Sequence, residues 1–121
     1  MTFLAIRGAT TCSQNTKEDI TSATQALVKE MIDKNSLDQS QIISILFSAT
    51  RDLTKEFPAT AARGLGLDDI PLMCAQELEI EGSMPRCIRV MMHVDADISR
   101  SEVSHIFLGE AKNLRKDLVK E

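Results

Sequence analysis

An arginine in the middle of an apolar segment is the most informative chemical group of this sequence. If segment 87–94 is a strand, its side chains alternate between two faces. One face carries Ile88, Val90, Met92 and Val94, and the other carries Cys87, Arg89, Met91 and His93. A guanidinium between sulfur-containing neighbours is costly to bury without an anion. Arg89 therefore either pairs with an acidic residue of the same sheet, such as Glu77, or faces an anionic ligand.

Three further charged residues adjoin apolar or small neighbours. Glu77 ends the apolar segment 71–77, where its carboxylate either accepts a hydrogen bond from a substrate hydroxyl or is solvated. Arg7 follows the first apolar run and Arg63 lies in a short predicted helix. Each arginine either clamps a carboxylate by bidentate hydrogen bonds or is a surface charge. Because the net charge is −4, these arginines favour a small anionic ligand over nucleic acid or an acidic membrane.

The patterns of metal binding, phosphate binding and nucleophilic catalysis do not occur here. The two histidines, His93 and His105, are far apart and no cysteine lies at ligand spacing, so we expect no metal site. The glycines form no phosphate-binding motif, and we expect no cofactor. No histidine is close to Cys74 in the sequence, so packing is the default role of its thiol.

Cysteine usage and hydropathy indicate the cellular setting. The three cysteines are odd in number and form no CxxC pair, which is typical of reduced thiols. The amino terminus does not resemble a signal peptide, and no apolar run is long enough to span a bilayer. We therefore expect a soluble cytoplasmic protein.

Strands and one long helix are the elements that must position these residues. Apolar runs predict strands at residues 3–6, 41–49, 71–77 and 86–94. The first run is followed by a predicted loop at 7–11, and the run 41–49 is apolar enough to be a central strand. Thr16 and Asp19 resemble a capping box, and helical spacing behind them predicts a long helix that ends near Lys34.

The remaining segments predict shorter elements. A short helix is expected through 59–65, where glycines stop it, and Ser99 with Glu102 is able to cap another. In the tail, 103–108 has the pattern of a strand and 111–119 has helical propensity, with a break at Gly109.

This order predicts an α+β fold, a single domain over 1–121 with a mixed β-sheet packed against one long helix. The core must be built mainly from aliphatic side chains, because aromatic residues make up only 3% of the chain. One helix covers one face of the sheet, so the other face needs a partner. Self-association is the economical solution.

Several groups of residues follow one another in a distinctive order. They are Ile6–Thr11, Ser48–Thr50 with Asp52 and Leu53, Phe57–Ala59 with Ala62 and Arg63, Cys74–Glu77, Arg86–Met91, His105–Leu108, and Leu114 with Arg115. Together they resemble the small monofunctional chorismate mutases of the bacterial trimeric type, from about the first strand to the end of the chain.

The resemblance implies an isomerase that rearranges chorismate to prephenate in the shikimate pathway of aromatic amino-acid biosynthesis, without any cofactor. It also implies a homotrimer that forms a pseudo-α/β-barrel, with sheets inside and helices outside. The active sites would lie in clefts between neighbouring subunits.

The resemblance also implies roles for individual residues. One subunit would line the cleft with Arg7, Cys74, Glu77, Arg89 and Phe107. The adjacent subunit would add Phe57, Ala59 and Arg63, with Leu114 and Arg115 near the mouth and Met73 among the substrate-binding positions. Arg89 would stabilise charge on the ether oxygen, and Arg7 and Arg63 would hold the carboxylates. Glu77 would accept a hydrogen bond from the ring hydroxyl, with Cys74 a minor partner.

Two departures from the family pattern leave alternatives open. Phe107 stands where the family usually has a tyrosine, and Met73 and Thr60 replace commoner polar or basic choices. A non-enzymatic trimeric module that binds a small carboxylate in the same cleft is therefore a second interpretation. A purely structural partner-binding domain is a third, but it leaves Arg89 and Glu77 unexplained.

Overall fold

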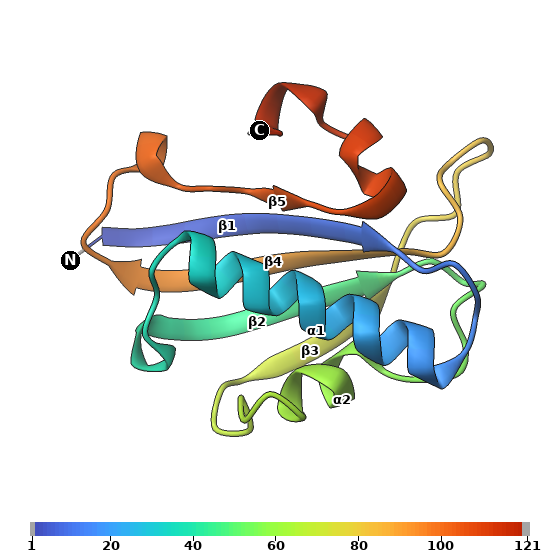
Figure 1. Ribbon diagram of the computed structural model, residues 1–121, viewed down its shortest axis with the longest axis horizontal. Helices are drawn as coiled ribbons and strands as arrows, with labels where there is room; N and C mark the ends of the chain where they lie inside the picture. Colours follow the sequence, from blue (N-terminus) through green and yellow to red (C-terminus); the bar gives the residue numbers. More distant parts are fainter. Residues whose placement is uncertain (1, 120–121) are drawn as a thin grey trace.

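The computed structural model describes residues 2–119, and a five-stranded mixed sheet forms its centre (Figure 1). In spatial order the strands are β3 (Leu72–Gln76), β2 (Ile42–Ala49), β4 (Cys87–Ala96), β1 (Thr2–Thr11) and β5 (Ile106–Phe107). Strands β1 and β2 run antiparallel to the central strand β4, whereas β3 runs parallel to β2 and β5 parallel to β1. The predicted mixed sheet is confirmed, and the run 41–49 is an interior strand as expected.

Strand β1 is longer than its apolar run predicted. Residues 7–11, which the sequence indicated as a loop, continue the strand and pair with β4 as far as Thr11 and Cys87. Pairing on both sides of Gly8 and Ala9 overrides their low β-propensity. A Cβ added at Gly8 would collide with the Sδ atom of Met31, so this glycine allows the long helix to approach the sheet closely.

Helix α1 (Lys17–Lys34) crosses one face of the sheet (Figure 1). The predicted cap is confirmed, since Thr16 Oγ1 accepts a hydrogen bond from the backbone N–H of Asp19 at 3.1 Å. Its apolar side buries Ile20, Leu27, Val28 and Met31. Leu27, Val28 and Met31 pack against the strands to form the main core with residues such as Ile6, Phe47 and Met92, whereas Ile20 packs in a smaller cluster with Cys12 and Ile88. The helix is the covering layer that the sequence predicted.

The second helix, α2 (Pro58–Arg63), lies beside the edge strand β3 (Figure 1). It begins with proline at a position where the missing N–H costs nothing and ends at Arg63, before the predicted end at Leu65. Gln25 of α1 donates a hydrogen bond to the Ala61 carbonyl oxygen at 3.0 Å, which ties the two helices together. Among the described residues, no helix is long and apolar enough to cross a membrane.

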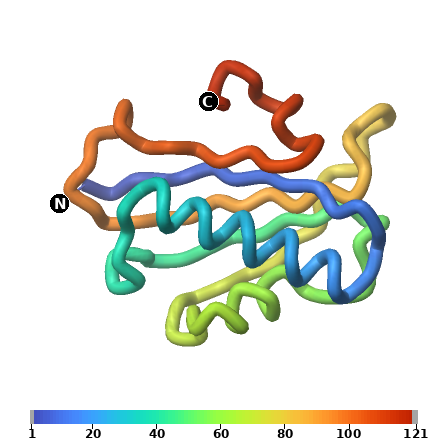
Figure 2. The backbone as a smooth tube through the Cα atoms, in the orientation of Figure 1, coloured from blue at the N-terminus to red at the C-terminus, as the bar shows by residue number. Residues whose placement is uncertain are grey.

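The carboxy-terminal tail differs most from its prediction. The strand expected over 103–108 is reduced to Ile106–Phe107, and the expected helix is two short 3₁₀ helices, Gly109–Asn113 and Lys116–Leu118. Gly109, with φ 58°, marks the predicted break. The tail turns back over β1 and β5 (Figure 2). The Ser99 capping box is confirmed, although the helix it begins is a single 3₁₀ turn, Arg100–Glu102.

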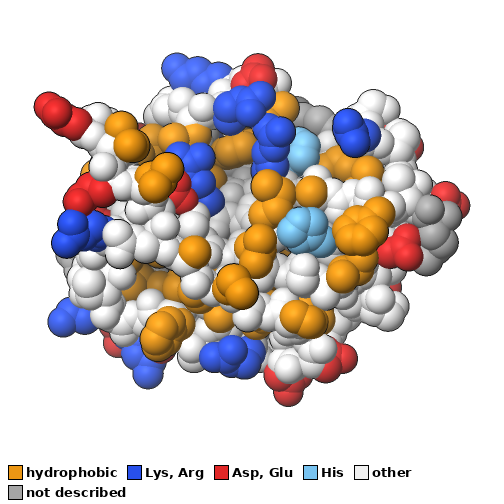
Figure 3. Space-filling model, turned by 180° about the vertical axis from the view of Figure 1, so that it is seen from behind, with side chains coloured by type: hydrophobic (Ala, Val, Ile, Leu, Met, Phe, Trp, Pro, Cys, Tyr) orange, Lys and Arg blue, Asp and Glu red, His pale blue; other side chains and the backbone are white. Residues whose placement is uncertain are grey.

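Neither α1 nor α2 covers the opposite face of the sheet. Among residues 2–119, the 3₁₀ helices of the tail pack on its β1–β5 side, against Ala9 and Phe107, and leave the rest open (Figure 1). Large apolar side chains are exposed on this open face, namely Phe3, Leu46, Met73 and Met91. Figure 3 views the molecule from this side and shows apolar side chains around a central hollow. The expected need for a partner on this face therefore has a physical basis in exposed apolar surface.

Candidate active site

A hollow of about 490 Å³ lies on the open face of the sheet, over β1, β2 and β4. Arg7, Arg89, Phe107 and Arg115 line it together with Ser48. Figure 3 shows Lys and Arg side chains gathered along one rim of the hollow. The structure thus brings four of the predicted arginine and aromatic positions to one place, with Arg115 contributed by the tail.

Strand alternation places Arg89 in this hollow. Ile88, Val90 and Met92 are buried against the helix layer, and Arg89 points to the other face, as predicted. Its neighbours in register are Ala9 of β1 and Ser48 of β2. Because both flanking side chains are small, the guanidinium has room to lie over the sheet.

Glu77 follows the end of β3 and forms an ion pair with Arg89. The distance from Arg89 Nε to Glu77 Oε1 is 3.3 Å, and the side chains are 49% and 23% exposed. The other carboxylate oxygen of Glu77 accepts a hydrogen bond from the Ser48 hydroxyl. Arg89 therefore fits both interpretations, an ion-pair partner of an acidic residue and a ligand-facing arginine, because it pairs with Glu77 and also lines the hollow. An ion pair this exposed contributes little to stability, on the order of 0–1 kcal/mol.

The backbone of Arg7 is held by a histidine. Its N–H donates a hydrogen bond to Nδ1 of His105 at 2.9 Å, so the ring proton of this histidine resides on Nε2. This contact was not predicted from the sequence, in which His105 was considered only as a possible metal ligand and as part of the family resemblance. Nothing in the local pattern links two residues so far apart in the chain.

Residues of the tail complete this side of the hollow. Arg115 donates two hydrogen bonds to Asp117, from Nε at 3.0 Å and from a terminal nitrogen at 2.8 Å. These bonds, and more weakly the charge of Arg7, lower the pKa of the Asp117 carboxyl. Leu114 packs against the cluster of Ala9 and Phe107 and so ties the tail to the sheet.

The other predicted site residues lie in a second group at the β3 edge. A hollow of about 480 Å³ there is lined by Phe57 and Cys74. The Cys74 sulfur accepts a hydrogen bond from the backbone N–H of Ala59 at 3.4 Å. Arg63, at the end of α2, donates a hydrogen bond to Thr60 Oγ1 at 3.2 Å. Within one chain, this group is separate from the hollow that Arg89 lines.

Within one chain Cys74 does not lie beside Arg89, and its place in the cleft between subunits stays a prediction. In register Cys74 lies opposite Phe47, whose side chain is buried toward the helix layer. Met73 lies opposite Leu46 and faces the open side with it. Because alternate residues of a strand face opposite ways, Cys74 is directed toward α2, whereas Met73 shares the face of Arg89.

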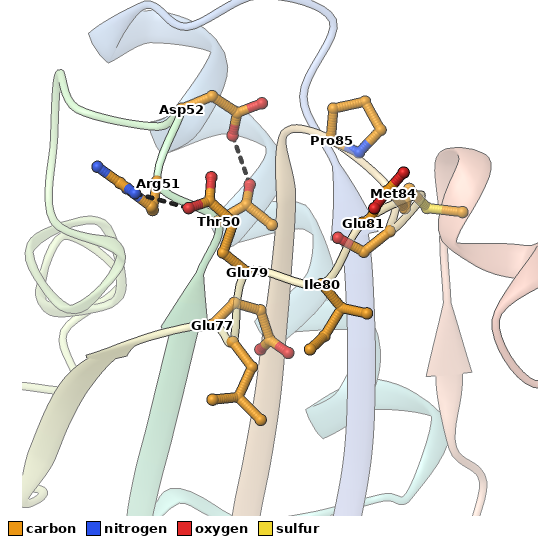
Figure 4. Close-up of a pocket in the computed structure, with 11 residues that line it drawn as sticks. Thr50, Arg51, Asp52, Glu77, Glu79, Ile80, Glu81, Met84 and Pro85 are labelled. Carbon is orange, nitrogen blue, oxygen red and sulfur yellow. Dashed lines mark hydrogen bonds and ion pairs between the residues drawn. The ribbon is translucent and has the colours of Figure 1, made fainter.

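A network of hydrogen bonds fixes the loops on either side of Glu77. Asp52 accepts hydrogen bonds from Thr50 Oγ1 at 2.5 Å and from the backbone N–H of Arg86 at 3.0 Å. Arg51 forms an ion pair with Glu79 at 2.6 Å. Thr50, Arg51, Asp52 and Glu79 line a hollow of about 300 Å³ that Glu77 also borders (Figure 4). The loop before β4 is thus tied to the end of β2.

The thiols and acidic groups provide little nucleophilic or metal-binding capacity. Burial raises the pKa of Cys12 to about 11, and it also raises the pKa of Cys87. Both are therefore protonated thiols at neutral pH rather than nucleophilic thiolates. Across residues 2–119, no group of His, Cys, Asp and Glu side chains is arranged to hold a metal ion.

This chain is similar in sequence and in fold to known chorismate mutases. The family model described as chorismate mutase type I matches residues 3–118. The chorismate mutase AroH of Bacillus subtilis (strain 168) is 39% identical over 119 residues, which are 98% of this chain and 94% of that protein. The AroH of Thermus thermophilus is 40% identical over 114 residues, which are 93% of each chain.

A solved structure gives the same result at the level of the fold. The chorismate mutase from Clostridium thermocellum superposes with a TM-score of 0.89 at 49% sequence identity. The match covers 91% of this chain and 98% of that one. The similarity in sequence and in architecture therefore extends along nearly the full length of the chain. This chain belongs to the type I chorismate mutase family.

Proposed function

We propose that this protein is a single chorismate mutase domain that rearranges chorismate to prephenate, with active sites shared between the subunits of a homotrimer. The observation that carries the reaction is the hollow in which Arg7, Arg89 and Arg115 converge beside the Arg89–Glu77 pair. Family membership supports the substrate, and the chemistry of the hollow suits it. The reaction belongs to aromatic amino-acid biosynthesis, which supports a cytoplasmic location.

The rearrangement requires positioning and electrostatic stabilisation. One carbon–oxygen bond breaks and one carbon–carbon bond forms within a single molecule, so no nucleophile, redox partner or cofactor takes part. A flexible dianion must be held in a compact conformation, which is an entropic contribution to the rate. Negative charge then grows on the ether oxygen, and a fixed cation stabilises the transition state more than the substrate.

Residues of the hollow and of the group at the β3 edge both have roles in the proposed reaction. Arg89 would donate to the ether oxygen, because it is held over the sheet on a central strand with its terminal nitrogens able to donate. Arg7, Arg63 and Arg115 would bind the carboxylates, for which paired guanidinium donors are well suited. Glu77 would accept the hydrogen bond of the ring hydroxyl, and Phe57 and Leu114 would exclude water.

The separation of the two residue groups supports a shared site. Phe57, Ala59 and Arg63 lie at the β3 edge, away from the hollow of the same chain that Arg89 lines. A neighbouring copy packed on the open face would bring its own β3 edge to this hollow. The same packing would cover the exposed Leu46 and Met91. A heterologous contact of this kind forms a closed ring when the rotation between neighbours closes, as it would in the proposed trimer.

An absorbance assay tests the proposed reaction. Purified protein is mixed with chorismate, and the loss of chorismate's ultraviolet absorbance is followed with no additive. Turnover supports the mutase. Saturable binding without turnover would instead favour the binding module, which the replacement of the usual tyrosine by Phe107 keeps as the second candidate.

A tyrosine at position 107 is expected to improve substrate binding. Phe107 lines the hollow beside Ala9, so a hydroxyl on its ring would be directed at bound ligand. Phe107→Tyr should lower KM by the equivalent of about 0.5–1.5 kcal/mol, the usual net contribution of one hydrogen bond. Steady-state kinetics of the two proteins gives the comparison. An unchanged or raised KM would mean that this site obtains the contact elsewhere.

A further inference from the structure

The carboxylate of Glu77 is held from two sides by residues of two different strands. Arg89 of β4 pairs with Oε1 at 3.3 Å, and the Ser48 hydroxyl of β2 donates a hydrogen bond to Oε2. Ser48 lies opposite Arg89 in one neighbouring strand and opposite Ala75 in the other, so its side chain is on the open face. The three polar side chains therefore form one contiguous cluster at the hollow.

We propose that Ser48 is a positioning residue for the rearrangement, whose hydroxyl fixes the carboxylate of Glu77 and, through it, the guanidinium of Arg89. This inference rests on the proposed chorismate mutase function and extends it to a residue that need not touch the substrate. It concerns the geometry of the pair rather than the chemistry of the reacting bonds.

The first step is the anchoring of Glu77. Its backbone N–H donates to the Ala49 carbonyl oxygen at 2.9 Å, which extends the β2–β3 ladder past the end of β3. This bond fixes the backbone but leaves the long side chain free to rotate, and restricting such a side chain has an entropic cost. A hydroxyl that donates to a carboxylate makes a charge-assisted bond, which is stronger than a neutral one. Ser48 thus selects one orientation of Glu77.

The second step is that the fixed carboxylate of Glu77 restricts the orientation of the Arg89 guanidinium. The ion pair uses one carboxylate oxygen and the Nε atom, so the other oxygen is the one that Ser48 holds. A pair whose arginine is 49% exposed gains little from attraction alone. Fixing the carboxylate at a second point keeps the pair in one geometry, and the terminal nitrogens of Arg89 keep one direction. Preorganisation of a donor is what electrostatic catalysis requires.

Two substitutions of the same shape separate the hydroxyl from the packing. Ser48→Thr retains the hydroxyl, whereas Ser48→Val has nearly the same volume without it, and both suit a strand. We expect Ser48→Val to lower kcat by about 5- to 30-fold with a smaller change in KM, while Ser48→Thr stays within about 3-fold of the parent. Equal activity of the two variants would overturn the proposal. If the added volume disturbs assembly, Ser48→Ala replaces the valine variant.

A second serine of the same strand is the matched control. Ser44 Oγ lies 3.2 Å from Nδ1 of His93 on β4, away from the residues that line the hollow. Ser44→Val also removes a strand hydroxyl that reaches across to β4. It should leave kcat unchanged, so a loss equal to that of Ser48→Val would indicate a general effect on the sheet and count against positioning.

A double-mutant cycle with Glu77→Ala tests the stated route. Ser48→Val should have almost no effect on kcat in the Glu77→Ala background, because the group it orients is gone. The same fold-loss in both backgrounds would refute action through Glu77. The same cycle is measured on the free energy of unfolding in urea, which does not require catalytic activity. If the parent protein does not convert chorismate, the proposed function fails, and coupling between the two residues in unfolding still decides whether Ser48 holds Glu77.

Discussion

Replacing Arg89 with alanine is expected to lower kcat by about 10²–10³-fold or more, the scale seen when one preorganised donor is removed. The assembly and its thermal unfolding should change little. The structure supports both halves of this expectation, since Arg89 lines the hollow and its pair with Glu77 is half exposed. Loss of so exposed a pair removes on the order of 0–1 kcal/mol of stability.

Charge, rather than shape, should account for the effect. Citrulline at position 89 keeps the outline of arginine and much of its hydrogen bonding but carries no positive charge, so it should also lose most of the activity. KM should change less than kcat if the contact strengthens mainly in the transition state. Kinetics and a melting curve on the same samples give both quantities. A variant that unfolds or dissociates would show instead that Arg89 is chiefly a structural partner of Glu77.

Mixing two inactive variants is expected to restore activity. Arg63→Ala removes a side chain of the group at the β3 edge and Arg89→Ala one of the hollow, so each variant alone would lack a complete cleft in the proposed trimer. When subunits exchange at random, about a quarter of the clefts receive an intact half from each variant, because a heterologous contact joins different faces of neighbours. Activity should therefore rise from near zero to about a quarter of the parent value.

The control for this experiment is a mixture that cannot complement. Arg89→Ala mixed with Arg7→Ala should stay inactive, because both residues line the hollow of one chain. Exchange is verified by labelling one variant and following mixed species by native mass spectrometry. Absence of recovery in the first mixture, with exchange demonstrated, would exclude a site shared between subunits.

Periodicity predicted the parts of the site that depend on one strand. The alternation in 87–94 was sufficient to place Arg89 away from Ile88 and Val90, and the structure confirms this. The cap at Thr16 and the long helix behind it were also correct, because their signals are local. A strand or helix face is determined by neighbours in sequence, so a single segment contains the information.

Contacts between distant segments were the part that could not be predicted. The length of β1 was missed because Gly8 and Ala9 have weak β-propensity, and pairing with β4 overrides it. The direction of Cys74 depends on its register with Phe47, and the hydrogen bond from Arg7 to His105 joins residues far apart in the chain. Register and tertiary contacts are set by packing, which no local pattern encodes.

The interior position of β4 in the sheet affects how strongly the site resists local unfolding. Strand β4 is bonded to β1 on one side and to β2 on the other along most of its length, so each of its paired amides exchanges with solvent only when an interior ladder of the sheet opens. Openings of that size approach global unfolding, whereas short 3₁₀ helices open at low free energy. Arg89, the proposed donor to the ether oxygen, is thus carried on an interior strand, whereas Arg115 lies on a segment that opens more readily. Local opening of the tail would expose the hollow to solvent while the charge on β4 stays in place.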